Sequence, residues 1–313
     1  MEQIRKQEGA LNQYFKYISS VGLVQAATTT ITGPLERYKI IKQAQEVLTI
    51  NDRYKYRTFA QYIMRIPKEQ GIQAFWRGNF ANVLNIIPRA GAQFLFYDNV
   101  QRTFFPQGEA SVSGGSYVLN KFLAAMSCGL LSLTLTYPLD TVRVRLSLEF
   151  SKKKENRLFK GVLQTLGETK TQQGMRQLYR GFLLSNMINL HYFITFYCAV
   201  DIIKNAELRE YLQGDASRFL NYIGVAQIGS LAALISVYPL DTIRKRLQQN
   251  GYNRSPNLKY KNTLDCFNKI KTQEGFSALF AGLTPNIVKF GIASTLQVYL
   301  LNELINNNMT FLN

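Results

Sequence analysis

The stretch YPLDTIRKRL, residues 238–247, nearly repeats the earlier YPLDTVRVRL at 137–146, and a more diverged copy, GPLERYKIIK, stands at 33–42. Each copy has a proline, a carboxylate two residues later and a cation three residues after that. The prolines, Pro34, Pro138 and Pro239, are 104 and 101 residues apart. Such a spacing predicts that the chain consists of repeats of about 100 residues.

A second phrase follows each proline by 43 or 44 residues and ends in a glycine. It reads EQGIQAFWRG up to Gly78, QQGMRQLYRG up to Gly181 and QEGFSALFAG up to Gly282. Two phrases that agree in order and spacing three times indicate true repetition. We therefore predict one integrated domain built of three repeats, at 1–110, 111–212 and 213–313.

Apolar runs long enough to cross a bilayer occur twice in each repeat. Four carry no charge, and two more are interrupted only by Arg89 and Lys289. A membrane-spanning helix needs roughly 20 predominantly apolar residues. The six predicted spans are 17–35, near 78–98, 122–139, 181–200, 219–240 and near 282–302.

The basic residues are distributed unevenly between the loops. Segments 36–77, 140–180 and 241–274 carry 9, 10 and 8 of the 37 Lys and Arg residues, whereas 98–121 and 201–218 carry 2 and 3. This alternation is the positive-inside pattern, and it places both termini on the side opposite the basic segments. The net charge of +17 is thereby explained by topology, so nucleic-acid binding is not expected.

Each basic segment also contains an amphipathic stretch with apolar residues at helical spacing: YRTFAQYIMRIPKEQG, FKGVLQTLGETKTQQG and YKNTLDCFNKIKTQEG. Between two spans, such a stretch predicts a short helix lying at the membrane surface. The predicted fold class is an all-α membrane protein, with six transmembrane helices in three pseudosymmetric repeats, each with a short surface helix on the basic side.

The repeated motif predicts kinks at the three prolines and charges beside them near the basic end of the first, third and fifth spans. Charges in a membrane are costly unless they are paired. Threefold arrangement lets each carboxylate meet the cation of the next repeat and close the bundle as a gate. Static pairs at helix ends are the alternative, and no nucleophile, metal set or glycine loop supports an enzyme. The predicted pairs are Glu36 with Arg143, Asp140 with Arg244, and Asp241 with Lys39.

The triple Pro-x-[Asp/Glu]-x-x-[Lys/Arg] motif with its glycine-ended phrase resembles the mitochondrial carrier family over essentially the whole chain. Within that family, PLERYKIIKQ, RIPKEQGIQAFWRGNFANV and RKRL are most similar to the ADP/ATP carriers. The resemblance implies exchange of anions, such as adenine nucleotides, across the mitochondrial inner membrane by alternating access. It further implies that the basic loops lie in the matrix and the termini in the intermembrane space.

No cofactor is predicted, and no metal, because His191 is the only histidine and the three cysteines lack metal-ligand spacing. The resemblance does imply bound cardiolipin. The lipid would lie where free N–H groups at helix N-termini attract phosphate. In this chain the corresponding positions are Arg77, Gly78, Arg180, Gly181, Ala281 and Gly282.

The predicted central cavity departs from the ADP/ATP carriers. Thr29, Asn85 and Phe193 stand where those carriers have cations, and Lys289 alone keeps a charge. Arg89, one turn from Asn85, is either a relocated anion contact or an arginine packed between helices. The remaining predicted cavity residues on the fourth span are Ile188, Asn189 and Tyr192.

The resemblance also implies a second gate on the side of the intermembrane space, built from an acid and a cation on each even-numbered span, and in this sequence the set is incomplete. The fourth span keeps Asp201 and Lys204, whereas Asp98 on the second span has Gln101 where a cation is expected. Two functions therefore stay open. The chain is either a transporter of the ADP/ATP carrier type with an altered substrate site, or a non-transporting carrier fold bound as a structural subunit within a larger inner-membrane assembly, such as a respiratory complex.

Overall fold

The computed structural model describes residues 19–44, 55–104, 114–205 apart from 154 and 156, 215–250 and 260–309. Within these ranges every regular element is a helix, so the predicted all-α class is confirmed. The predicted positions of the two termini concern residues that lie outside the described ranges.

The long helices follow the predicted spans. Residues 19–31 are helical, a turn at Thr32 follows, and the chain continues as α2 (Gly33–Ala44). The other long helices are α4 (Asn79–Phe104), α5 (Gly114–Ser147), α8 (Phe182–Asn205), α9 (Asp215–Gln249) and α11 (Leu283–Met309).

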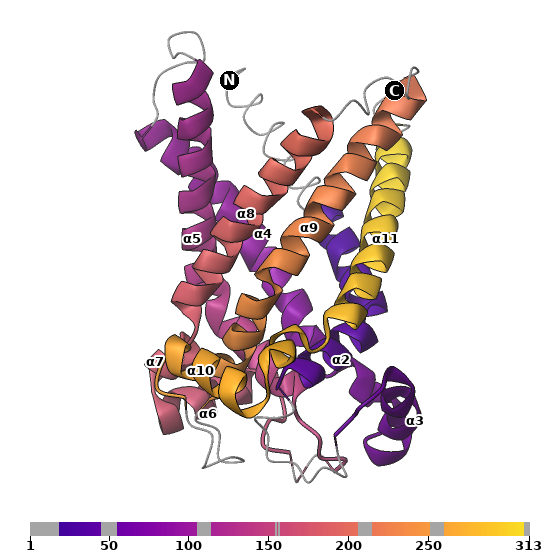
Figure 1. The fold of residues 1–313 in the computed structure, drawn as a ribbon, viewed down its shortest axis with the longest axis vertical. Helices are drawn as coiled ribbons and strands as arrows, with labels where there is room; N and C mark the ends of the chain where they lie inside the picture. The colour runs from indigo at the N-terminus through magenta and orange to yellow at the C-terminus, as the bar shows by residue number, and fades with distance from the viewer. Residues whose placement is uncertain are drawn as a thin grey trace, which may run out of the picture.

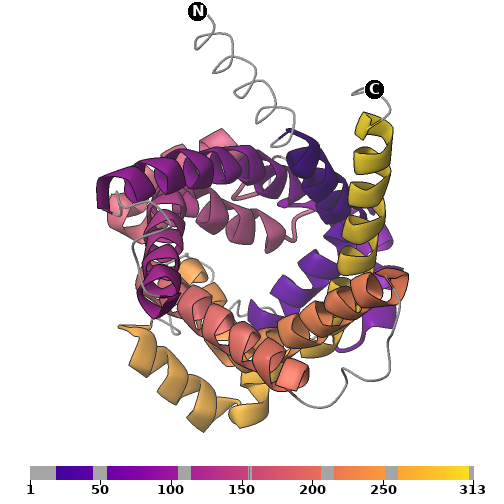
Figure 2. The ribbon, with the colours of Figure 1, turned by 90° about the horizontal axis from the view of Figure 1, so that it is seen from above.

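These helices stand around a common axis, as the view along the molecule shows (Figure 2). Pro138 and Pro239 lie inside α5 and α9, and Pro34 follows the turn at Thr32. Proline removes a helical N–H, so each of these helices has a weakened point at the same level of its repeat. Large apolar side chains such as Leu183 and Ile87 stay exposed on the long helices, as expected of surfaces that face lipid.

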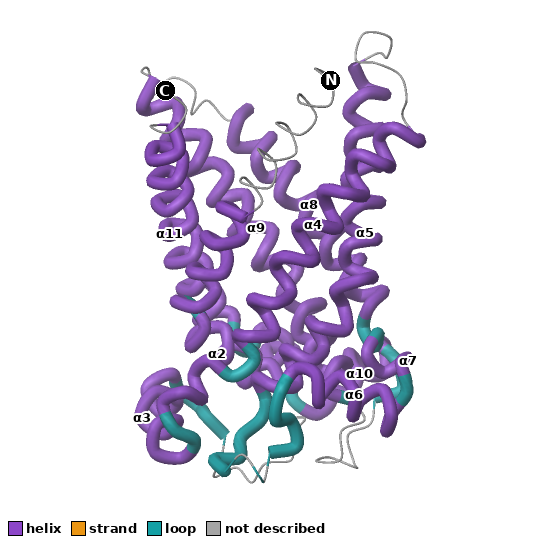
Figure 3. Tube along the Cα trace, turned by 180° about the vertical axis from the view of Figure 1, so that it is seen from behind, coloured by secondary structure: helices purple, strands orange, loops and turns teal. Residues whose placement is uncertain are grey.

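The short helices gather at one end of the molecule, which we call the basic end (Figures 1 and 3). Thr58 and Asn262 cap α3 and α10 by accepting hydrogen bonds from the N–H groups of Gln61 and Asp265. The three short helices are α3 (Phe59–Glu69), α6 (Val162–Gln173) and α10 (Thr263–Gln273), followed by η2 (Ile72–Trp76), α7 (Met175–Leu178) and η3 (Phe276–Phe280).

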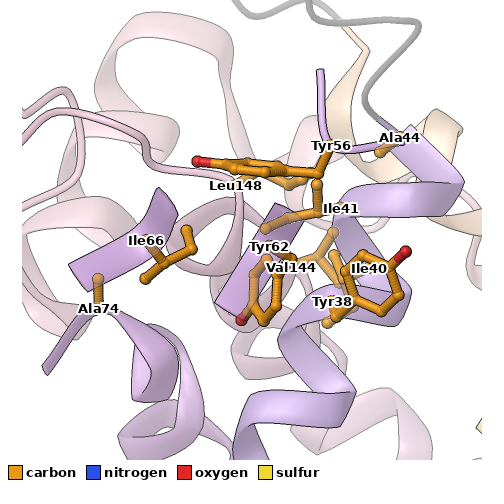
Figure 4. Close-up of a cluster of buried hydrophobic side chains, with 10 residues drawn as sticks. All are labelled: Tyr38, Ile40, Ile41, Ala44, Tyr56, Tyr62, Ile66, Ala74, Val144 and Leu148. Atoms are coloured by element: carbon orange, nitrogen blue, oxygen red, sulfur yellow. The ribbon is translucent and has the colours of Figure 1, made fainter. Parts of the chain in front are cut away.

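The hydrophobic core is concentrated at the basic end, where the short helices pack on the long ones. In the first repeat, Tyr38, Tyr62 and Ile66 pack in a cluster that also contains Val144 of α5 and Leu148, the residue after α5 (Figure 4). An equivalent cluster in the third repeat contains Cys266 and other residues of α9, α10 and α8. The core therefore joins neighbouring repeats directly below the predicted gate.

Three stretches of the described chain are apolar and long enough to cross a membrane: Met175–Val200, Ile223–Gln249 and Phe276–Leu300. They contain or overlap the predicted fourth, fifth and sixth spans. The helices that carry the other three predicted spans stand in the same ring of helices (Figure 2). They include polar residues such as Thr28 to Thr30, Asn85 and Arg89, which lower their hydropathy.

Candidate functional site

The structure brings together all three ion pairs predicted from the repeated motif. Nη2 of Arg143 lies 2.5 Å from Oε1 of Glu36, and Nζ of Lys39 lies 3.1 Å from Oδ2 of Asp241. Nη2 of Arg244 lies 3.6 Å from Oδ2 of Asp140. Each pair joins two different repeats, because α2, α5 and α9 each contribute one acid and one cation to the three pairs.

Further contacts connect these pairs into one network, which we call the ion-pair ring. Arg143 also lies 3.9 Å from Asp140 of its own helix, and Arg244 lies 3.3 Å from Asp241. The six side chains are only 11–16% exposed, so their interactions are little screened by water. The ring members are Glu36, Lys39, Asp140, Arg143, Asp241 and Arg244.

Lys289 takes part in the same network, which the sequence did not predict. Its Nζ lies 2.7 Å from Oε2 of Glu36, so the carboxylate of Glu36 is shared between Lys289 and Arg143. The one expected cation position that keeps its charge, Lys289, is thus paired with an acid of the ring. Lys289 belongs to α11, so this contact ties a fourth helix to the ring.

Two glutamines of the site were also missed by sequence reasoning. Nε2 of Gln43 donates to Asp241 at 3.2 Å, and Nε2 of Gln248 donates to Asp140 at 3.1 Å. Both stand nine residues after the motif proline, a spacing that could have revealed them. The second repeat has Ser147 there, whose hydroxyl donates instead to the carbonyls of Arg143 and Arg77.

Buried arginines fasten neighbouring repeats to each other beneath the ring. Nε of Arg37 donates to the carbonyl of Ser147, Nε of Arg145 to that of Gln248, and Nε of Arg246 to that of Gln43. Each arginine also bonds to its own repeat, to Gln70, Thr169 and Glu274 respectively. The three junctions therefore repeat one arrangement, with the ring above and the arginines below.

The glycines that end the second phrase lie against the motif helices. Gly78, Gly181 and Gly282 all have φ between 83° and 87°, the left-handed region that favours glycine. A Cβ at Gly78 would lie 2.7 Å from the carbonyl of Arg143, and one at Gly282 would lie 3.2 Å from that of Lys39. These positions therefore fix how closely the even-numbered spans approach the ring helices.

The side chains beside these glycines bind protein in the structure. Arg77 donates to the carbonyls of Glu149 and Ser151, and Arg180 donates to that of Tyr260. The carbonyls of Arg180 and Ala281 accept from Tyr137 and Tyr238. Burial lowers the pKa of Arg77 to about 10, so it stays charged at neutral pH. Backbone N–H groups of the following helices remain the predicted lipid contacts.

The predicted cavity residues have different surroundings. Ile188 is buried among Leu184 and Val237, and Tyr192 packs against the same cluster. Asn189 is partly buried. Asn85 is 6% exposed, and its Oδ1 has no hydrogen-bond partner among the described residues.

Thr29 and Phe193 stand, like Asn85, where the resemblance implies cations, and Arg89 lies one turn from Asn85. Thr29 donates to the carbonyl of Ala26, and Phe193 is 45% exposed. Arg89 is exposed and interacts electrostatically with Asp140, Arg143 and Arg244. It therefore projects toward the inside of the helix ring, where the ion-pair ring lies.

The predicted second gate cannot be described at the level of side chains. Asp98, Asp201 and Lys204 lie in helical backbone of α4 and α8, but their side chains lie outside the described residues. Their pairing stays a prediction.

A comparison with known protein families agrees with this threefold architecture. The model of the family described as mitochondrial carrier protein matches residues 12–108, 115–210 and 215–310. The chain belongs to the mitochondrial carrier family. The three matches also confirm that this carrier consists of three repeats, although the exact repeat boundaries given above stay a prediction.

Several relatives match this carrier over most of its length and most of their own. It is 31% identical to ADP/ATP translocase 4 of Homo sapiens, over 89% of this chain and 87% of the relative. It is 30% identical to ADP/ATP translocase 2 of Tachyglossus aculeatus aculeatus, over 89% and 93%, and to ADP/ATP translocase 3 of Bos taurus, over 90% and 94%. The predicted resemblance to ADP/ATP carriers is thus confirmed.

Proposed function

We propose that this carrier moves an anionic solute across the mitochondrial inner membrane by alternating access, with the ion-pair ring as its matrix gate. The observation that supports the proposal is the set of three ion pairs, each of which joins two repeats. Ion pairs hold the helices together yet can separate, and alternating access needs two states of comparable free energy. A threefold set of separable contacts provides such an equilibrium.

The solute is proposed to be an anion because cations outnumber acids around the ring. Lys289 and Arg89 add to the three ring cations, while the acids at this level among the described residues are Glu36, Asp140 and Asp241. Such an excess raises the local concentration of anions. Adenine nucleotides are one candidate class, since the relatives are ADP/ATP translocases.

The proposal is tested by uptake into liposomes that contain the purified full-length protein. The labelled solutes are ADP, phosphate and a panel of carboxylates, each exchanged against the same solute inside. We expect counter-exchange of at least one anion above the rate of protein-free liposomes, and loss of that exchange when Glu36, Asp140 and Asp241 are all replaced by their amides. No exchange of any anion would reject the transport function.

A structural role within a larger inner-membrane assembly is the second candidate, and one observation favours it. Lys289 is held by Glu36, while Thr29, Asn85 and Phe193 leave three expected cation positions uncharged. Native electrophoresis of mildly solubilised membranes separates the candidates. A structural subunit would migrate with a complex far larger than its 35.8 kDa and would show no exchange in liposomes.

We further propose that both termini face the intermembrane space and that cardiolipin phosphates bind at the N-termini of α4, α8 and α11. The basic loops support this orientation through the positive-inside pattern. Free N–H groups at the first turns after Gly78, Gly181 and Gly282 attract phosphate. Protease added to mitoplasts should remove residues 1–10, and cleavage only from the matrix side would reverse the topology.

A further inference from the structure

We propose that Arg89 and Asn85 form a ligand site for a small organic anion that has one charged group and a neighbouring hydroxyl or amino donor. This inference rests on the transport function proposed above and specifies its substrate class. Two observations support it. Arg89 is a cation near the ion-pair ring that has no ion-pair partner among the described residues, and Oδ1 of Asn85 is a hydrogen-bond acceptor that has no donor there.

The first step is that nearly all cations at the ring already have partners or are buried. Lys289 lies 2.7 Å from Glu36, and the ring cations lie within 4 Å of a carboxylate. Lys245, the residue after Arg244 of the ring, is 2% exposed. None of these groups is available to a solute without breaking the closed end of the molecule.

Arg89 differs from these cations. It is exposed, and among the described residues it makes no hydrogen bond or ion pair. Asp140 is the acid that interacts with it electrostatically, but Arg143 and Arg244 already share that carboxylate. The guanidinium of Arg89 therefore offers planar N–H donors to an anion on the inner side of the helix ring.

Asn85 supplies the second contact, one helical turn closer to the basic end. Residues four apart on a helix lie on one face, about 5–6 Å apart at Cβ. Oδ1 of Asn85 is buried without a partner, and a buried acceptor without a donor is destabilising. Rotation of the amide about its side-chain bonds would present this oxygen to an O–H or N–H group of a ligand held at Arg89.

One free cation and one unpaired acceptor together define the ligand. A single arginine matches a single carboxylate or comparable group, whereas a di- or triphosphate requires several cations. The acceptor selects for a donor within a few ångströms of the charge. Hydroxy acids and amino acids have this combination. A nucleoside triphosphate carries more negative charge than the single guanidinium of Arg89 can balance.

The test compares lactate with propionate, which differ by one hydroxyl group. Binding to the purified full-length protein is measured by isothermal titration, and uptake is measured in liposomes. We expect lactate to bind about three- to tenfold more tightly than propionate, as for one neutral hydrogen bond. Asn85→Leu should abolish this preference, so that lactate binds no more tightly than propionate.

Arg89→Gln should weaken the binding of both lactate and propionate by about ten- to a hundredfold. Arg89→Lys should retain most of the binding of propionate. Arg57→Gln is the matched control, since it removes the same charge from an exposed position outside the helix ring. Equal thermal unfolding midpoints of the variants establish that they fold.

The outcomes separate this inference from the transport function. If another anion is exchanged but Arg89→Gln leaves its binding unchanged, the inference is wrong and the transport function stands. If ADP binds more tightly than lactate, the proposed substrate class is wrong. If no anion binds or is exchanged, both proposals fail together.

Discussion

Glu36, a member of the ion-pair ring, binds two cations, whereas the motif predicted only one partner for it. Its two oxygens bind cations of two other helices, Arg143 on α5 and Lys289 on α11. Removing one partner of a buried pair leaves a charge uncompensated, which costs about 3–5 kcal/mol, whereas exposed pairs contribute about 0.2–1 kcal/mol. The residue is therefore expected to couple the helices strongly.

A double-mutant cycle tests this coupling. Glu36→Gln and Arg143→Gln are measured singly and together by thermal unfolding in detergent, and we expect a coupling energy of about 1–3 kcal/mol. Arg65 and Glu69 on α3 form a matched control pair, which is about 30% exposed and lies four residues apart. Their cycle should give less than about 1 kcal/mol. Equal coupling in the two cycles would mean that the ring is no stronger than a surface pair.

The buried thiol of Cys266 should make the folded protein less stable as the pH rises into the alkaline range. Burial in α10 raises the pKa of its thiol to about 12. Between about pH 8.5 and 12 the unfolded chain loses this proton and the folded chain keeps it, so stability falls as pH rises, by up to about 1.4 kcal/mol per pH unit. The unfolding midpoint of Cys266→Ala should therefore decline less steeply from pH 8.5 to 10.

The same measurement has an internal control. Tyr62 and Tyr260 also have their pKa values raised to about 12 by burial, and a tyrosine in the unfolded chain ionises near pH 10, at the upper end of this window. Both tyrosines are present in the wild type and in Cys266→Ala, so the difference between the two slopes comes from the thiol. Cys198 is an exposed cysteine, and Cys198→Ala should keep the wild-type slope. An unaltered slope in Cys266→Ala would contradict the proposed cause.

At the scale of elements, the approach of α4 to α5 depends on Gly78. Its φ of 86° is in the left-handed region, and an added Cβ would meet the carbonyl of Arg143 at 2.7 Å and the hydroxyl of Ser147. Gly71 has a similar φ of 88° but nothing within 4 Å of its Cβ position. The two glycines therefore separate backbone strain from steric contact.

This difference yields a prediction. Gly71→Ala should cost about 1–2 kcal/mol of stability through backbone strain alone. Gly78→Ala should cost that amount and a further 1–3 kcal/mol, roughly as for overpacking, because α4 must move away from α5. Thermal unfolding of both variants measures the difference. Equal losses would show that the contact across the two helices relaxes without cost.

The sequence predicted helices well because periodicity and proline spacing are local signals. The surface helices, the glycine turns and the ring pairs all follow from offsets within one repeat and from threefold arrangement. Gln43 and Gln248 could have been found by the same offset of nine residues. Arg37 could not, because it stands three residues after its proline, whereas Arg145 and Arg246 stand seven residues after theirs.

At the scale of the whole molecule, prediction was limited by contacts between distant segments. Lys289 and Glu36 are 253 residues apart, and no periodicity indicates that a cavity cation reaches the ring. The surroundings of Arg89 likewise depend on how α4 faces α5 and α9. The sequence left two roles for Arg89, and its exposure and electrostatic partners favour an anion contact over packing between helices.

The whole molecule also determines how well adenine nucleotides are exchanged, and we predict poor exchange of ADP for ATP. Thr29, Asn85 and Phe193 lack the cations implied by the resemblance, and Lys289 is already paired with Glu36. Each lost charged hydrogen bond is worth about 1.5–3 kcal/mol. Three losses would amount to roughly 4.5–9 kcal/mol if they were additive, and even the lower value is more than about a thousandfold in affinity.

The measurement is uptake of labelled ADP into ATP-loaded liposomes that contain the purified protein. The comparison is a variant with Thr29→Lys, Asn85→Arg and Phe193→Arg, which returns the three cations. Fast exchange by the natural sequence would contradict the prediction, because uncharged side chains would then suffice for phosphate recognition. A gain in the variant would show that cation loss alone limits exchange. If neither protein exchanges ADP, the incomplete second gate, with Gln101 where a cation is expected, becomes the separate barrier to test.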